Sequence, residues 1–485
     1  MNQRFANRIV FWLTGAVLTA AAVAAIPDAR EKEIPEYTGS QACMGCHTGQ
    51  HSLWKSSDHA HMVVPVINAT DLPLDISEAP AELQAELRKA SYIVAGTFFI
   101  DRDDKTQHYK LLSVIYDKEA KAYKPSDVAL TWSTDCAGCH TTNMNTAALK
   151  WGEPGIGCEA CHGPGRDHIL GKGDKSKIVK TKQADVCGQC HGGNDARTGA
   201  KLMADGTKWI VGYRPGMKLS DLKGVQFTPV DPEKTPPDPA LTEAHLRNYN
   251  MWAASRHAHA LDRIATSKFA GAECYGCHTA EGLAAKQQGV KLAGKETFNT
   301  ITCVACHDPH NSENPHQLVS APQDLCNACH TQDGVVKGRA AKGVEASASM
   351  HSGFDCIQCH MTESNHLMKV IRPDAPDLAE QRLDTCSTCH TNKSKKESAA
   401  QLQNWQASFT KKMDGLQSDL KEISAALKEK PDALNADLKA KLSTARADIS
   451  ILTRDKSRGA HNFDYAMKIM DKAGKDLEAV KRAIK

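Results

Sequence analysis

Apolar and polar positions alternate most regularly in the C-terminal part of the chain. Apolar residues recur there every three or four positions, at Leu402, Trp405, Phe409, Met413, Leu416, Leu420, Ile423 and Leu427, and then at Leu434, Leu438, Leu442, Ala445, Ile449 and Leu452. This spacing places them on one face of a helix, with charged residues opposite. Pro431 is expected to start the second helix, and a third is expected after residues 459–462. Residues 398–485 therefore predict an antiparallel three-helix element.

Shorter patterns precede this element. Residues 92–100 and 108–116 are rich in β-branched and aromatic side chains and are separated by turn-forming residues, which predicts a small β-hairpin. Residues 192–273 are rich in proline and glycine, notably between Pro229 and Pro239, and predict an extended loop that closes into a short helix near 242–260. The predicted fold class is mainly α with much irregular structure.

All eighteen cysteines lie in nine copies of the pattern Cys-x-x-Cys-His. In chain order, motifs 1 to 9 are Cys43, Cys46, His47; Cys136, Cys139, His140; Cys158, Cys161, His162; Cys187, Cys190, His191; Cys274, Cys277, His278; Cys303, Cys306, His307; Cys326, Cys329, His330; Cys356, Cys359, His360; and Cys386, Cys389, His390. This is the attachment pattern of c-type haem, in which both thiols bind the porphyrin and the histidine is the proximal iron ligand. Zinc sites and disulfide frameworks also use paired cysteines, but neither requires a histidine after every second one. The sequence predicts nine covalently bound haem c groups, each containing iron.

Composition agrees with a core built around haem. Hydrophobic residues make up 41% of the 485 residues and aromatic residues only 5%, which is little for a core of this size. The formal charge of +3 omits the haem propionates, which ionise like other carboxylates and would make the loaded protein more acidic. No basic patch interleaved with aromatic residues is present in the sequence, so nucleic-acid binding has no support.

The motifs and spacers suggest an order of domains. We expect a signal peptide at 1–25, an N-terminal tetrahaem region at 38–191, a spacer at 192–273, a C-terminal pentahaem region at 274–395 and the helical domain at 398–485. Within the two haem regions a pattern repeats, because Trp54, Ser57, His59, Ala60 and His61 recur at the same offsets as Trp252, Ser255, His257, Ala258 and His259. Such a repeat indicates duplicated haem-binding modules.

The N-terminus resembles an export signal. Arg4 and Arg8 precede an uncharged, mostly apolar run at 9–25, and residues 22–24 offer a cleavage site with small side chains. The alternative is an uncleaved membrane anchor, because the run is nearly long enough to span. Either interpretation places the haem region outside the cytoplasm, in the periplasm or at the outer surface.

Thirteen histidines lie outside the motifs, enough to give nine irons a second ligand. The first candidates for distal ligands are His59 and His257 in the repeat, and His351 and His366 beside motif 8. His51, His108 and His245 are interpreted as surface or propionate-binding residues. The remaining distal candidates are His310, His316, His61, His259, His168 and His461.

These motifs resemble a superfamily of multihaem cytochromes. Residues 54–60, together with motifs 2 and 3, are similar to tetrahaem cytochrome c-554. Motif 8, followed by motif 9 and C-terminal helices, is similar to pentahaem ammonia-forming nitrite reductase and octahaem hydroxylamine oxidoreductase. The reductases typically carry a lysine at the catalytic haem, where this chain has His278. They also insert a long segment with histidine and tyrosine where only 25 residues separate His330 from Cys356.

The sequence therefore favours an exported electron carrier of anaerobic respiration over an enzyme. Two histidine ligands close both axial positions, so small molecules cannot reach the iron, and no catalytic residue is assigned. The expected partners are a membrane quinol-oxidising complex and a downstream cytochrome or reductase. The competing hypothesis is a reductase or oxidase of nitrogen or sulfur compounds with an open haem at motif 5. A polymerising filament is a third, and the C-terminal helices would otherwise pack on the haem region or on a second subunit.

Overall fold

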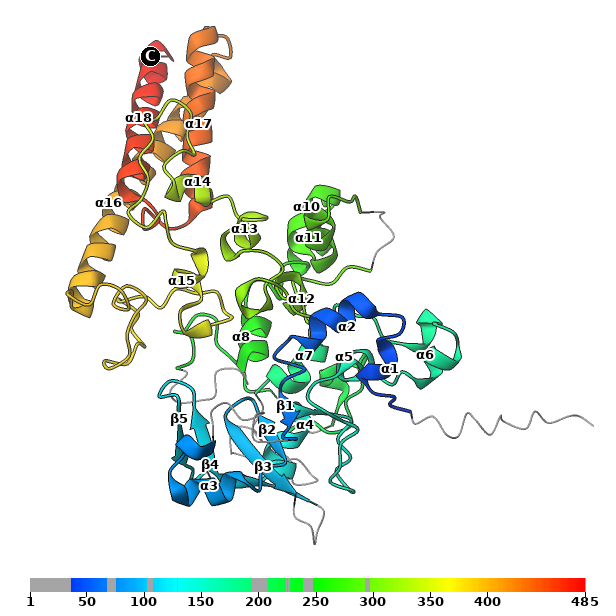
Figure 1. The fold of residues 1–485 in the computed structure, drawn as a ribbon. Coiled ribbons are helices and arrows are strands. Elements are labelled where there is room, and N and C mark those ends of the chain that lie inside the picture. The colour runs from blue at the N-terminus through cyan, green and yellow to red at the C-terminus, as the bar shows by residue number, and fades with distance from the viewer. Residues whose placement is uncertain are drawn as a thin grey trace, which may run out of the picture.

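The computed structural model describes residues 36–67, 76–102, 108–128, 130–193, 208–223, 225, 227–238, 247–292 and 297–484. A β-sheet lies at one end, three long helices lie at the other, and short helices and loops carry the motifs between them (Figure 1). The expected fold class is confirmed. The predicted signal peptide lies outside the described residues, and none of the described helices is long and apolar enough to cross a membrane.

The short helices are α1 (Ser40–Cys43), α2 (Thr48–Lys55), α3 (Ala81–Leu87), α4 (Ala137–His140), α5 (Cys158–His162), α6 (Arg166–Leu170), α7 (Asp185–His191), α8 (Asn248–Ala254), α9 (Asp262–Ala265), α10 (Ala272–His278), α11 (Ala280–Gln287), α12 (Cys303–Cys306), α13 (Pro322–Asn327), α14 (Asp333–Val336) and α15 (Cys356–His360). Many of them coincide with a motif. In a helix, residues at i, i+3 and i+4 share one face, so both thiols and the imidazole of a motif point to the same side. The local helix thus presents all three haem-binding groups together.

The sheet contains five antiparallel strands in sequence order, β1 (Val63–Pro65), β2 (Tyr92–Val94), β3 (Phe98–Arg102), β4 (Tyr109–Asp117) and β5 (Ala122–Pro125). The predicted hairpin is present as β3 and β4, but the single strand expected at 92–100 is wrong. Ala95 (φ 50°) and Gly96 (φ 62°) adopt left-handed conformations, and the chain turns back between β2 and β3. Paired left-handed residues are typical of tight hairpin turns. A two-stranded sheet, β6 (Thr141–Thr142) with β7 (Glu153–Pro154), links motifs 2 and 3.

The C-terminal domain consists of α16 (Lys395–Glu429), α17 (Ala436–Asp455) and α18 (Phe463–Ile484). The predicted apolar face of α16 is buried at Phe409, Met413, Leu416 and Ile423, and it joins one core with α17 and α18. The expectation that Pro431 starts the second helix is wrong. Asn435 caps α17 instead, because its side chain accepts a hydrogen bond from Leu438 N, whereas proline has no N–H and no polar side chain to offer.

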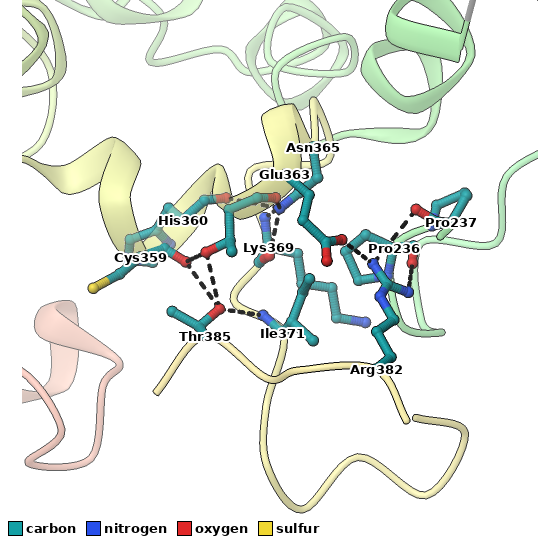
Figure 2. A network of polar contacts seen from close by, with 11 residues as sticks. Pro236, Pro237, Cys359, His360, Glu363, Asn365, Lys369, Ile371, Arg382 and Thr385 are labelled. Carbon is teal, nitrogen blue, oxygen red and sulfur yellow. Dashed lines mark hydrogen bonds and ion pairs between the residues drawn. The ribbon is translucent and has the colours of Figure 1, made fainter. Parts of the chain in front are cut away.

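The proline-rich part of the spacer packs against the C-terminal haem region. Lys369 Nζ donates to three backbone carbonyls of the proline-rich loop 229–238, at 2.8 to 2.9 Å. Arg382 donates to Pro236 O at 2.6 Å and forms an ion pair with Glu363 (Figure 2). The helix expected near 242–260 is shorter than predicted, since α8 ends at Ala254 and residues 239–246 lie outside the described residues.

Candidate haem-binding sites

A large cavity runs through the middle of the molecule. Its volume is about 3190 Å³, and cysteines or histidines of motifs 2 to 8 line it. All eighteen cysteines lie in the described residues, and none forms a disulfide. The described residues also hold no cluster of three or more His, Cys, Asp or Glu side chains arranged around one metal ion. The geometry therefore gives no support to a disulfide framework or a zinc site.

Within the described residues, seven motif histidines are seen to face a second histidine across a gap of nearly constant width. With metal–nitrogen bonds of about 2 Å and roughly 1 Å from ring nitrogen to ring centre, two axial imidazoles have centres about 6 Å apart. The observed ring-centre distances are His47–His168 6.3 Å, His162–His310 6.1 Å, His191–His59 6.3 Å, His307–His366 6.3 Å, His330–His257 6.0 Å, His360–His461 6.1 Å and His390–His351 5.9 Å. These gaps fit a haem iron between each pair.

The histidines are oriented by hydrogen bonds at one ring nitrogen. Among the motif residues, Nδ1 of His162 lies 2.7 Å from Val179 O and Nδ1 of His307 lies 2.8 Å from His316 O. Among the facing residues, Nδ1 of His366 lies 2.8 Å from Ser364 O. A carbonyl that accepts from Nδ1–H fixes the tautomer and leaves the Nε2 lone pair for a metal.

Burial keeps many of these rings neutral, which is the form that binds a metal. Desolvation, together with the neighbouring His330, lowers the pKa of His257 to about 4. Desolvation also lowers the pKa of His59 and His366. The cause is the same in each case, because an apolar surrounding disfavours the protonated imidazole.

Three of the candidate distal ligands do not face a motif histidine in the described residues. Both ring nitrogens of His259 are engaged, Nδ1 with Asp262 at 3.2 Å and Nε2 with Ala253 O at 3.1 Å, and the side chain is 61% exposed. His61 Nδ1 lies 2.9 Å from Ser57 O. His316 contributes its carbonyl oxygen to motif 6 rather than its ring. None of the three rings pairs with a motif histidine in the described part of the chain.

Other contacts are described for the histidines of motifs 2 and 5. His140 lies 6.3 Å from Trp132, between ring centres. His278 is oriented by Ala260 O, 2.7 Å from Nδ1, but no ring among the described residues pairs with it. Tyr275 of motif 5 stacks on Phe298 at 4.4 Å. His245 lies outside the described residues.

The sequence repeat has an equivalent structure in both copies. Trp54 Nε1 donates to Ile156 O, and Trp252 Nε1 donates to Ile301 O, each at 2.8 Å. Each isoleucine stands two residues before a motif, motif 3 in the first copy and motif 6 in the second. Both tryptophans therefore anchor their repeat in the same way, as expected of duplicated modules.

Motifs that are distant in sequence touch one another. The thiols of Cys43 and Cys158 lie close enough to shift each other's pKa, which brings motifs 1 and 3 together. Equivalent thiol contacts join motif 4 to 6, motif 7 to 8 and motif 5 to 7, through the pairs Cys187–Cys303, Cys326–Cys356 and Cys277–Cys329.

Further hydrogen bonds and one apolar cluster join other pairs of motifs. Gln189 Nε2 donates to Ala160 O at 3.1 Å, which joins motifs 3 and 4. Thr385 Oγ1 lies 3.1 Å from Thr362 Oγ1 and donates to Cys359 O at 3.5 Å, joining motifs 8 and 9 (Figure 2). Motifs 6 and 7 share an apolar cluster that contains Ala305 and Ala328.

Glu159, inside motif 3, is a residue that the sequence did not single out. It is 2% exposed and accepts hydrogen bonds from Thr38 N, Gly39 N and Gly165 N at 2.6 to 2.9 Å. A buried carboxylate is stable only when it is paired or hydrogen-bonded. Glu159 therefore ties the segment before motif 1 to motif 3, and only its position between two cysteines could have hinted at this.

Comparisons with known proteins find similarity to cytochromes that carry CXXCH motifs. A family model for cytochrome c554 and c-prime matches residues 100–163, which contain motifs 2 and 3, and residues 242–308, which contain motifs 5 and 6. A model for a doubled CXXCH motif matches residues 296–335. No curated protein matches the sequence significantly.

Two solved structures share the fold over most of the chain. The outer cell wall cytochrome OcwA is 25% identical, with a TM-score of 0.74 over 91% of this chain and 100% of that chain. An undecaheme cytochrome from the S-layer of Carboxydothermus ferrireducens is 21% identical, with a TM-score of 0.62 over 91% of this chain and 69% of that chain. A cytochrome c nitrite reductase from Desulfovibrio desulfuricans is 17% identical, with a TM-score of 0.32 over 47% of this chain and 70% of that chain.

Proposed function

We propose that this chain, a multihaem c-type cytochrome, is an exported electron carrier with nine haems, most of them bound by two histidines. The observation that carries the proposal is the set of seven histidine pairs with centres 5.9 to 6.3 Å apart. A pair of this kind closes both axial positions of an iron, which leaves only a change of oxidation state. When bound, the haem irons accept and donate single electrons. We assign His168, His310, His59, His366, His257, His461 and His351 as the distal ligands of motifs 1, 3, 4, 6, 7, 8 and 9.

The contacts between motifs suggest the order in which the haems adjoin. Thiol and backbone contacts connect motifs 1, 3, 4, 6, 7, 8 and 9 in series. Motif 5 adjoins motif 7, and motif 2 adjoins motif 3 through the β6–β7 pairing. The exposed motif cysteines are Cys46 of motif 1, Cys359 of motif 8 and Cys389 of motif 9. Motif 1 at one end of the series and motifs 8 and 9 at the other are therefore the expected contact points for redox partners.

The proposed partners are a membrane quinol-oxidising complex and a downstream acceptor. An outer cell wall cytochrome and an S-layer cytochrome share this fold, which supports a location outside the cytoplasm. The apolar segment at 9–25 supports export by a cleaved signal.

Rapid mixing of oxidised protein with a limiting amount of reductant tests the carrier proposal. Because neighbouring motifs touch along the whole series, we expect electrons to distribute over all haems in a single fast phase. A protein-sized oxidant should then reoxidise every haem. A haem assay should give nine haems per chain as the reference. If a group of haems exchanged electrons only in a separate slow phase, the continuous series would be contradicted.

A second candidate function, a reductase of nitrogen or sulfur compounds, is favoured by one observation at motif 5. No described ring pairs with His278, whereas Arg256 and Arg263 line the same cavity and could attract an anion. In this case one ferric haem per chain should be high-spin as isolated, and its spectrum should shift on adding nitrite, hydroxylamine or sulfite. An entirely low-spin spectrum, unchanged by these compounds, would exclude this candidate.

A further inference from the structure

The loop between α17 and α18 brings a buried carboxylate to a candidate iron ligand. Asp455 is the last residue of α17, and its side chain is 3% exposed. Its Oδ1 lies 2.7 Å from Nδ1 of His461, whose ring centre is 6.1 Å from that of His360 in motif 8. Asp455 and His461 both line the central cavity.

Asp455 occupies an electrostatically unfavourable position at the C-terminal end of α17. The C-terminal end of a helix carries a partial negative charge, which repels a carboxylate. In the described part of the chain, Asp455 forms no ion pair with lysine or arginine. Ser457 Oγ donates to Oδ2 of Asp455, so His461 and Ser457 together satisfy the carboxylate.

Three other ligand candidates have weaker hydrogen-bond acceptors at Nδ1. Nδ1 of His168 and of His366 lies near backbone carbonyls, which are neutral. His310 has a carboxylate neighbour, Asp308, but that contact is longer, at 3.2 Å, and both side chains are 36% exposed, so water screens it. His461 therefore has the most strongly polarised ring among these ligand candidates.

We propose that Asp455 lowers the reduction potential of the haem bound by motif 8. A carboxylate that accepts Nδ1–H gives the imidazole anionic character and makes Nε2 a stronger donor, which favours ferric over ferrous iron. Motif 8 adjoins motifs 7 and 9. Cys356, Cys359, His360 and His461 would hold this haem, which would supply single-electron exchange with haems held at motifs 7 and 9. Asp455 thus lowers the potential of this haem below the value it would have with a neutral partner at His461, and it is a positioning residue, since it acts through His461.

The inference rests on the proposed ligation by His461, and the experiment separates the two. First, His461→Ala should convert one low-spin haem to high-spin, and the signal that is lost identifies haem 8. If no signal were lost, the ligation itself would be refuted. Asp455→Asn is then compared with wild type by redox titration of that signal, followed by electron paramagnetic resonance.

We expect Asp455→Asn to shift the ferric–ferrous equilibrium of this haem at least tenfold towards the ferrous form, about 59 mV for one electron. Asp455→Glu should restore most of the wild-type value, and Ser457→Ala tests the same carboxylate if the asparagine variant does not fold. Asp308→Asn is the matched control at an exposed histidine–carboxylate pair and should shift its haem several-fold less.

Ser457→Ala gives a readout that a merely structural role would not produce. Loss of the Ser457 hydrogen bond makes the carboxylate a stronger acceptor, so the potential should fall, opposite to the effect of Asp455→Asn. Shifts of both variants in the same direction, or an unchanged haem 8 potential in Asp455→Asn, would overturn the proposal.

Discussion

Replacing His257 with alanine is expected to convert one low-spin ferric haem per chain to high-spin, whereas His259→Ala should leave the spectrum unchanged. The ring of His257 lies 6.0 Å from that of His330 in motif 7, and its burial lowers the pKa so that the ring is neutral. The ring of His259 is exposed and hydrogen-bonded through both nitrogens. Only the first substitution therefore removes an axial ligand.

The two variants form a matched pair, because the residues are two positions apart in the same sequence repeat. Electron paramagnetic resonance of the ferric protein should show a new high-spin signal equal to one haem per chain in His257→Ala. Absence of that signal would refute the assignment of His257 to motif 7. A comparable signal in His259→Ala would show that the structure places the wrong histidine opposite His330.

Gly338→Ala is expected to lower the free energy of unfolding by about 3 kcal/mol. The added Cβ would strain the left-handed backbone conformation and would also clash with a neighbouring backbone atom. Gly338 has φ +64° and follows α14, where Arg339 N donates to Gly334 O at 2.8 Å and Gly338 N donates to Val335 O at 3.0 Å. A glycine in this conformation closes many helices. A Cβ at this position would lie 1.9 Å from Ser347 O, and this carbonyl belongs to the backbone and cannot rotate away.

The effect should extend to the C-terminal domain. Asn462 Nδ2 donates to Ser347 O at 2.6 Å, and Tyr465 Oη accepts from Ala341 N at 2.9 Å, so the loop after α14 is fastened to α18 next to His461. Thermal or denaturant unfolding measures the loss. Gly353→Ala is the control, because that glycine has ordinary φ and a Cβ added there would meet nothing within 4 Å, so stability should change by less than about 0.5 kcal/mol. Equal stability of the two variants would contradict the geometry at Gly338.

Local patterns predicted the C-terminal helices and the β3–β4 hairpin because those elements depend on the spacing of neighbouring apolar residues. The same reasoning missed the turn at Ala95 and Gly96, because β-branched and aromatic residues on both sides made 92–100 look continuous. It also placed a helix start at Pro431, although the cap is formed by Asn435. In both cases the backbone conformation of one or two residues decided the boundary.

The sequence by itself determined the cofactor class and predicted nine proximal positions, because the spacing Cys-x-x-Cys-His sets both thiols and the imidazole on one face of a short helix. It also named His59, His257, His351 and His366 as ligand candidates. Only the tertiary structure decided which ring faces which motif, since partners such as His47 and His168 are far apart along the chain. The tertiary structure also placed Asp455 beside His461 and joined the motifs into one series. These contacts depend on the packing of whole segments rather than on any local spacing.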